Sequence, residues 1–124
     1  MSTVAGVRAI ANNAFNNSVV DLHGGIPTAN VIGFNFWGGN NQKWNLVQQT
    51  EPNTYHIQSV MTKTYISVND SNKLVASTTP KAWKIAEYDN GYRISSGDKF
   101  WTLDDGKPFT QASPSYLPIL TVES

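Results

Sequence analysis

The chain has 124 residues, 40% of them hydrophobic, which is enough to bury one core and too few for two ordinary domains. Nine Lys and Arg residues are balanced by nine Asp and Glu residues, and no three basic residues are consecutive. This balance excludes the charge pattern of proteins that bind nucleic acids or anionic membranes. Many Asn, Ser, Thr and Gly residues favour a neutral, hydrogen-bonding surface that suits hydroxyl-rich ligands.

The chain has no cysteine, which excludes disulfides, thiolate metal sites and a cysteine nucleophile and favours a reducing compartment. The N-terminal sequence MSTVAGVRAI lacks the basic start and continuous apolar run of a signal peptide. No apolar segment approaches the length that spans a membrane. We therefore expect a cytoplasmic protein without membrane insertion, with secretion by a non-classical route left open.

Apolar residues recur mostly at two-residue spacing between Gly, Pro, Asn and Asp, which predicts an all-β protein. Three successive units, of about residues 5–50, 51–88 and 89–124, show the same order of strand-forming residues. In the first unit these residues are Ile10, then Val20 with Leu22, Val31, and Trp44 with Leu46. In the second they are Ile57, Ile66 with Val68, Leu74, and Trp83 with Ile85. In the third they are Ile94, Trp101 with Leu103, Phe109, and Leu120 with Val122.

Three units of four short strands predict one domain over residues 1–124, a closed barrel capped by hairpins, which is the β-trefoil arrangement. Turn-forming sequences at equivalent places agree with this prediction. They are DLHGG at 21–25, NDSN at 69–72 and DDGK at 104–107. The first unit is longer, because of an insertion around residues 25–30. The pattern leaves one alternative open, a generic β-sandwich in which the similar spacing arises by chance.

The first unit carries side chains whose chemistry suits a sugar. The repeat pattern brings Asp21, Phe34, Trp37 and Asn41 to the outer side of this unit. A carboxylate accepts hydrogen bonds from neighbouring hydroxyls, an amide donates and accepts, and an aromatic ring covers the apolar face of a pyranose. Glycines let the backbone approach a ligand closely, and four stand in the same segments, namely Gly24, Gly25, Gly38 and Gly39.

The sequences VVDLHGG (19–25) and VIGFNFWGGNNQKW (31–44) resemble the ricin-B-type lectin repeat, which ends in Gln-x-Trp, and in particular the cysteine-free mushroom lectins. Those lectins have the pattern Gly-aromatic-x-x-His-Gly-Gly-x-Asn-Gln-x-Trp. Trp37 stands at the position of the His. The resemblance is specific over residues 19–46, and over the remaining chain only the general pattern is similar. The matching residues are Gly33-Phe34, Gly38-Gly39 and Asn41-Gln42-x-Trp44.

The resemblance implies a lectin that binds galactose/N-acetylgalactosamine- or mannose-type glycans. It implies that Asp21 is the principal acceptor for sugar hydroxyls, Phe34 the stacking platform, Asn41 a second hydroxyl partner and Gln42 their support. Trp37 would add a second aromatic wall. Gly24 and Gly39 would lie against the ligand, and His23 either edges the site or is an ordinary turn residue.

Alignment of the three units predicts one sugar site per chain, because the carboxylate and the amide are absent from the later units. The residues aligned with Asp21 and Asn41 are Ser67 and Pro80 in the second unit and Thr102 and Leu117 in the third. The expected partners are glycans or glycoproteins and not nucleic acid, and the expected state is a monomer or a homodimer. No cofactor and no metal are expected.

Enzymatic activity is not expected. His23 and His56 lack the spacing of metal ligands, and Asp104-Asp105-Gly106 is a turn signal rather than a catalytic carboxylate pair. Neither a nucleophile elbow nor a phosphate loop is present in the sequence.

Two other functions are weighed against the lectin. A fungal β-trefoil protease inhibitor would present Lys81, Arg93 or Lys107-Pro108 near a loop tip, and a lectin-like partner subunit would bind no sugar. Neither function requires an acidic, aromatic and amide set in the first unit, so this set favours the lectin.

Overall fold

The computed structural model describes residues 4–12, 18–88, 91–97, 99–102, 110–112 and 120–123. These residues form twelve strands and two short 3₁₀ helices. In the first unit the elements are β1 (Gly6–Asn12), β2 (Ser18–Leu22), η1 (His23–Gly25), β3 (Val31–Asn35), η2 (Asn40–Gln42) and β4 (Trp44–Gln48). In the second they are β5 (Thr54–Ser59), β6 (Tyr65–Val68), β7 (Leu74–Ser77) and β8 (Ala82–Tyr88). In the third they are β9 (Gly91–Ser96), β10 (Lys99–Thr102), β11 (Thr110–Ala112) and β12 (Leu120–Glu123).

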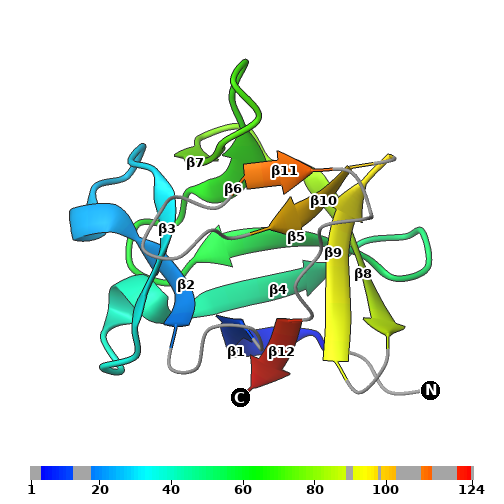
Figure 1. Ribbon diagram of the computed structural model, residues 1–124, viewed down its shortest axis with the longest axis horizontal. Coiled ribbons are helices and arrows are strands. Elements are labelled where there is room, and N and C mark those ends of the chain that lie inside the picture. Colours follow the sequence, from blue (N-terminus) through cyan, green and yellow to red (C-terminus); the bar gives the residue numbers. More distant parts are fainter. Residues whose placement is uncertain are drawn as a thin grey trace.

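Six of these strands close into a ring. Strand β1 pairs with β4, β4 with β5, β5 with β8, β8 with β9, β9 with β12, and β12 again with β1 (Figure 1). The other six form the hairpins β2–β3, β6–β7 and β10–β11, each of which pairs with the first strand of its own unit. A ring of six strands with one hairpin per unit is a β-trefoil, so the predicted fold class is confirmed.

Alternation along the strands fills the interior. In β5 every second residue is buried, as expected when one face of a strand packs on a core. The first strand of each unit contributes one fully buried isoleucine, namely Ile10, Ile57 and Ile94, and burying a side chain of this size contributes about 1.5–3 kcal/mol. Trp83 and Trp101 meet edge to face, with ring centroids 5.4 Å apart. The core is therefore continuous between the second and third units.

The tryptophans at the ends of the first two units, Trp44 and Trp83, each make an equivalent hydrogen bond within their own unit. The indole Nε1–H of Trp44 donates to the carbonyl oxygen of Val20 at 2.9 Å, and that of Trp83 donates to the carbonyl oxygen of Ile66 at 2.8 Å. Both bonds are buried, so each ties the end of its unit to that unit's second strand. Val20 and Ile66 are therefore structurally equivalent, and the residue that follows each of them is also equivalent.

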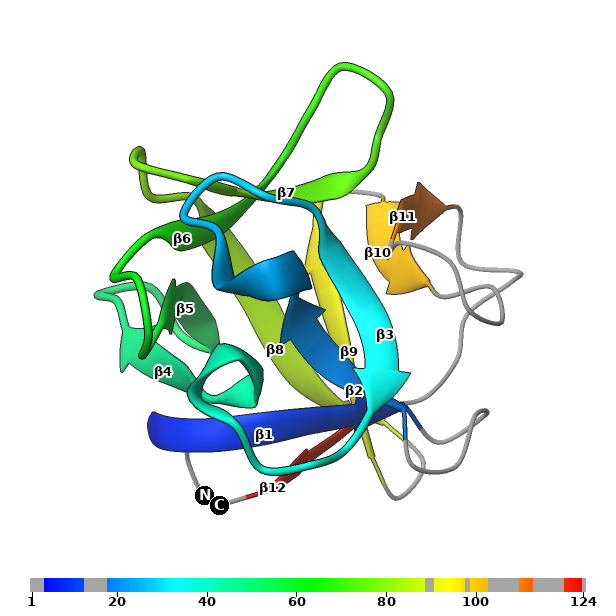
Figure 2. The ribbon, with the colours of Figure 1, turned by 90° about the vertical axis from the view of Figure 1, so that its left-hand side faces the viewer.

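The insertion in the first unit packs on the second unit. The backbone N–H of Ala76 in β7 donates to the carbonyl oxygen of Ala29 at 3.0 Å, and Asn30 forms an isolated bridge with Val75. In Figure 2 the segment between η1 and β3 lies beside β7. The insertion therefore joins two units that are consecutive in the chain.

One sequence-based placement is wrong. Arg93 was expected near a loop tip, but it lies within β9 and is half-buried, because its strand is held between β8 and β10. The expectations for Leu103, 104–107, Lys107-Pro108, Phe109 and Leu117 concern positions outside the described residues. Within the described part of the chain, no helix is long and apolar enough to cross a membrane.

Candidate functional site

The hairpin β2–β3 forms the base of the candidate site. Its register sets Asp21 opposite Ile32 and Val19 opposite Phe34, and residues directly opposite in an antiparallel pair share a face. Asp21 and Phe34 therefore lie on the outer face, two positions apart along the hairpin. Val20 and Leu22 alternate with Asp21 and are fully buried on the core face. The hairpin is amphipathic, as the alternation of its sequence predicts.

Asp21 is only 3% exposed although it is on the outer face, because η2 packs over β2. The side-chain amide of Asn41 donates to Asp21 Oδ1 at 3.0 Å, and that of Gln42 donates to Oδ2 at 2.9 Å. A carboxylate has about four acceptor positions, so each oxygen keeps one for another donor. Burial raises the pKa of the Asp21 carboxyl above its ordinary value of 3.8, while hydrogen bonds from Gln42 and Asn41 and the nearby His23 limit the rise.

The buried side chain of Gln42 fixes the position of Asp21 and of the segment after β3. It is 0% exposed, and its Nε2 also donates to the carbonyl oxygen of Asn35 at 2.8 Å. Its Oε1 accepts the backbone N–H groups of Trp37 at 2.9 Å and Gly38 at 3.2 Å. Both ends of the amide are thus used within the protein. Gln42 positions Asp21 and the segment after β3 and has no group left for a ligand.

A hollow of about 290 Å³ lies beside this network, lined by Gly24, Gly25, Trp37, Asn41 and Met61. Trp37 is 64% exposed. A Cβ at Gly39 would overlap its indole ring, so the ring can rest in this position only while residue 39 is glycine. Gly24 and Gly25 have φ of 65° and 66°, a conformation that favours glycine.

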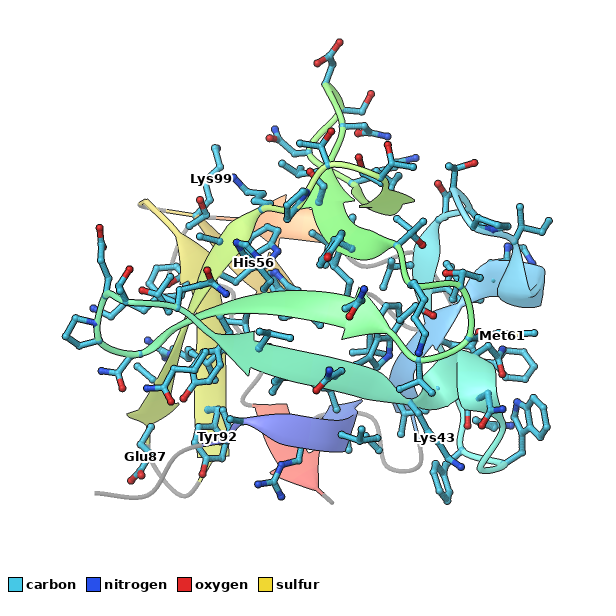
Figure 3. All side chains as sticks on the ribbon, turned by 180° about the vertical axis from the view of Figure 1, so that it is seen from behind. Lys43, His56, Met61, Glu87, Tyr92 and Lys99 are labelled. Atoms are coloured by element: carbon cyan, nitrogen blue, oxygen red, sulfur yellow. The ribbon has the colours of Figure 1, made fainter. Side chains whose placement is uncertain are left out.

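Met61 forms the far wall of the hollow and belongs to the second unit. It lies in the turn between β5 and β6, on the side that faces η1 and η2 (Figure 3). A Cβ at Gly25 would approach Met61 Cε and Sδ to 2.8 Å, so the thioether rests on that glycine. The sequence analysis missed Met61, because a methionine in a turn of another unit carries no local signal for a site.

The structure brings most of the predicted site residues together. Asp21, Asn41 and Gln42 form one hydrogen-bonded network, and Asn41 joins that network to the hollow that Trp37 and Gly24 also line. His23 is exposed in η1 next to Gly24. Phe34 is 52% exposed on the outer face of β3 but does not line the hollow.

The second unit lacks this network. Because Val20 and Ile66 are equivalent, Ser67 takes the place of Asp21. Pro80 takes the place of Asn41, because each lies three residues before the tryptophan of its unit, Trp83 or Trp44. Lys81 replaces Gln42, and its Nζ lies 5.1 Å from the centre of the Trp83 ring. Within the described residues, no group of three or more His, Cys, Asp or Glu side chains could hold a metal ion.

The fold and the site define a β-trefoil of the kind found among carbohydrate-binding proteins. A family model described as a ricin-type β-trefoil lectin domain-like family matches residues 40–111. This is more than half of the chain, and the protein belongs to that family. The match confirms the family that the sequence resemblance indicated, although its range overlaps residues 19–46 only at their end.

Solved structures agree on the fold. The crystal structure of the Rhizoctonia solani agglutinin superposes with a TM-score of 0.87 at 24% identity and covers 100% of this chain and 98% of that chain. The Macrolepiota procera ricin B-like lectin in complex with lactose gives 0.82 at 20% identity, with 99% of both chains covered. The designed threefold-symmetric protein ThreeFoil gives 0.81 at 16% identity, covering 96% of this chain and 99% of that chain.

Proposed function

We propose that this protein is a lectin with one sugar-binding site, formed by Asp21 and Asn41 beside the hollow of the first unit. The observation that carries the proposal is the buried Asp21 carboxylate, whose two oxygens are each held by one side-chain amide. Such a carboxylate is fixed in position before a ligand arrives, which lowers the entropic cost of binding. Its remaining acceptor positions suit two neighbouring sugar hydroxyls.

Asn41 supplies a second contact. Its Nδ2 donates to Asp21 and, at 3.4 Å, to the carbonyl oxygen of Leu22. No described residue donates to its Oδ1, so this oxygen is available for a sugar hydroxyl. The exposed indole of Trp37 borders the same hollow and provides an apolar wall for a pyranose ring. Phe34 would contact a ligand that extends along the outer face of the hairpin.

The proposed ligands are galactose/N-acetylgalactosamine- or mannose-type glycans. Support comes from proteins of similar structure that were solved with saccharides, namely the Macrolepiota procera ricin B-like lectin with lactose and SeviL with the asialo-GM1 saccharide. A monosaccharide at one such site would bind with millimolar to micromolar affinity, about 4–8 kcal/mol. A cytoplasmic location and a monomeric or homodimeric state are part of the same proposal, and a homodimer would add avidity.

A glycan array comparing the wild type with Asp21→Ala tests the site. Ser67→Ala is the matched control, because it removes the equivalent side chain from the second unit. We expect Asp21→Ala to abolish binding and Ser67→Ala to preserve it, with a calorimetric stoichiometry near one sugar per chain. Unchanged binding by Asp21→Ala, or a stoichiometry near three, would contradict the proposal. Absence of wild-type binding to every glycan, together with inhibition of trypsin or papain, would favour the inhibitor instead.

A further inference from the structure

Large apolar side chains border the hollow beside the candidate sugar site. Trp37 and Met61 line this hollow. Ile26 lies next to it, because a Cβ added to the lining residue Gly24 would be 3.6 Å from Ile26 Cδ1. All three apolar side chains are more than half exposed. Exposed apolar side chains that gather in one place mark a surface that meets a ligand or a partner. The hollow therefore has an apolar border that contacts with sugar hydroxyls do not use.

The backbone of the turn between β5 and β6 fixes the position of Met61. Its N–H donates to the hydroxyl oxygen of Ser59 at 3.1 Å, and Ser59 is buried. The N–H of the preceding residue, Val60, donates to the carbonyl oxygen of Lys43 at 3.1 Å. Because Lys43 directly follows η2, this bond ties the turn to the helix that carries Asn41. Met61 is thus held against the first unit by bonds that do not involve its own side chain.

The hollow joins these apolar side chains to the polar network of the site. Asn41 lines the hollow and also donates to Asp21. A sugar held through its hydroxyls by Asp21 and Asn41 therefore has Trp37 and Met61 as neighbours. A thioether adapts to apolar groups of different shape and makes favourable contacts with aromatic rings. A charged or hydroxylated group placed against it would lose water without gaining a strong hydrogen bond.

We propose that this site selects glycans whose bound sugar carries an apolar substituent, and that Met61 determines the selectivity. The inference rests on the proposed function, because Asp21 has to position the sugar. The substituent, an alkyl or aryl group, would lie against Met61 and Trp37, with Ile26 at its edge. Asp21 belongs to the first unit and Met61 to the second. The selectivity therefore depends on a contact between units, whereas the binding of sugar hydroxyls uses the first unit alone.

The test is isothermal titration calorimetry of the full chain with methyl and phenyl glycosides of galactose and of mannose, each in both anomeric forms. The methyl and phenyl members of a pair present the same sugar hydroxyls and differ in their apolar group. We expect the phenyl glycoside of at least one pair to bind about tenfold more tightly than its methyl counterpart. A tenfold ratio corresponds to about 1.4 kcal/mol, or roughly 55 Å² of additional apolar surface removed from water.

Met61→Gln should reduce this preference to about threefold or less, because an amide of similar length replaces the thioether. The variant should fold, since the Met61 side chain is exposed and the turn is held by its backbone. Val7→Thr is the matched control. It changes an exposed apolar residue of β1 that does not line the hollow, so the preference should stay at the wild-type ratio. Asp21→Ala should abolish binding of both glycosides of the pair.

Three results would overturn this inference and leave the proposed sugar site intact. These are equal affinities for the methyl and phenyl glycosides in every pair, an unchanged preference in Met61→Gln, and an equal loss of preference in Val7→Thr. Phenyl glycoside binding that survives Asp21→Ala would also overturn it, because the apolar group would then bind without its sugar. Absence of wild-type binding to every glycoside would overturn the proposed function and this inference with it, so the two failures are distinguished.

Discussion

Gln42→Ala is the substitution that most directly tests how the candidate site is held. The side chain of Gln42 makes four hydrogen bonds, and after its removal water can replace some of them but not all. The Trp37 and Gly38 N–H groups and the Asn35 carbonyl lie in an exposed or half-exposed segment, so water can take the place of Gln42 there. Asp21 Oδ2 is buried and would lose a charge-assisted bond of about 1.5–3 kcal/mol.

With a small further loss from the three replaceable bonds, we expect Gln42→Ala to lower the free energy of unfolding by about 2–4 kcal/mol. For a chain of this length the melting temperature should fall on the order of 10 °C. Because the bond from Gln42 is one of those that lower the pKa of Asp21, that pKa should rise further. Sugar affinity should weaken in parallel, since the carboxylate becomes less populated and less well positioned.

Chemical denaturation followed by circular dichroism measures the first effect. The matched control is Lys81→Ala at the equivalent position of the second unit, where only a cation–π contact of about 0.5–1 kcal/mol is lost. Equal denaturation midpoints for the two variants would refute the reasoning, because they would show that the Gln42 network adds no more to stability than the single cation–π contact of Lys81.

Gln42→Glu provides an isosteric comparison. It places a second carboxylate against Asp21, so two like charges compete for one buried site. At pH 7 this variant should be less stable than the wild type, and the difference should shrink on acidification as the pair takes up a proton. A difference that is independent of pH would contradict direct contact between the two side chains.

Four further predictions concern the site and the strands that hold it. Burial raises the pKa of Asp21 above 3.8, so protonation of this carboxyl stabilises the fold, fully so below pH 3.8. This stabilisation is lost as the pH rises through the pKa of the folded state. The free energy of unfolding of the wild type and of Asp21→Asn at several pH values measures this contribution. Sugar affinity should change in the opposite sense and fall on acidification through the same pKa, and a pH-independent affinity would exclude Asp21 as the acceptor. Gly39→Ala should displace Trp37, which is the exposed indole among the four tryptophans, and so change fluorescence and sugar binding while altering stability by less than about 0.5 kcal/mol. Trp44→Phe should cost about 1–3 kcal/mol, because the carbonyl oxygen of Val20 would lose its buried donor, and a change within measurement error would show that this bond is dispensable.

The sequence by itself determined the fold class and the composition of the first-unit network. Strand alternation is a local property, so two-residue spacing predicted an all-β protein, and the threefold order of apolar residues favoured a β-trefoil over a generic β-sandwich. Asp21 and Asn41 could be grouped because both lie at fixed offsets from repeat landmarks. The loss of the carboxylate and the amide in the second unit followed from the same offsets, and the equivalent indole bonds of Trp44 and Trp83 support that alignment.

Only the tertiary structure decided how these residues are placed around the site. Met61 forms a wall of the hollow because closure of the strand ring brings a turn of the second unit against the first. Phe34, in contrast, shares the outer face of the hairpin but lies away from that hollow. Contacts of this kind are made between segments distant in sequence, and they depend on strand pairing and closure that no local pattern of residues encodes.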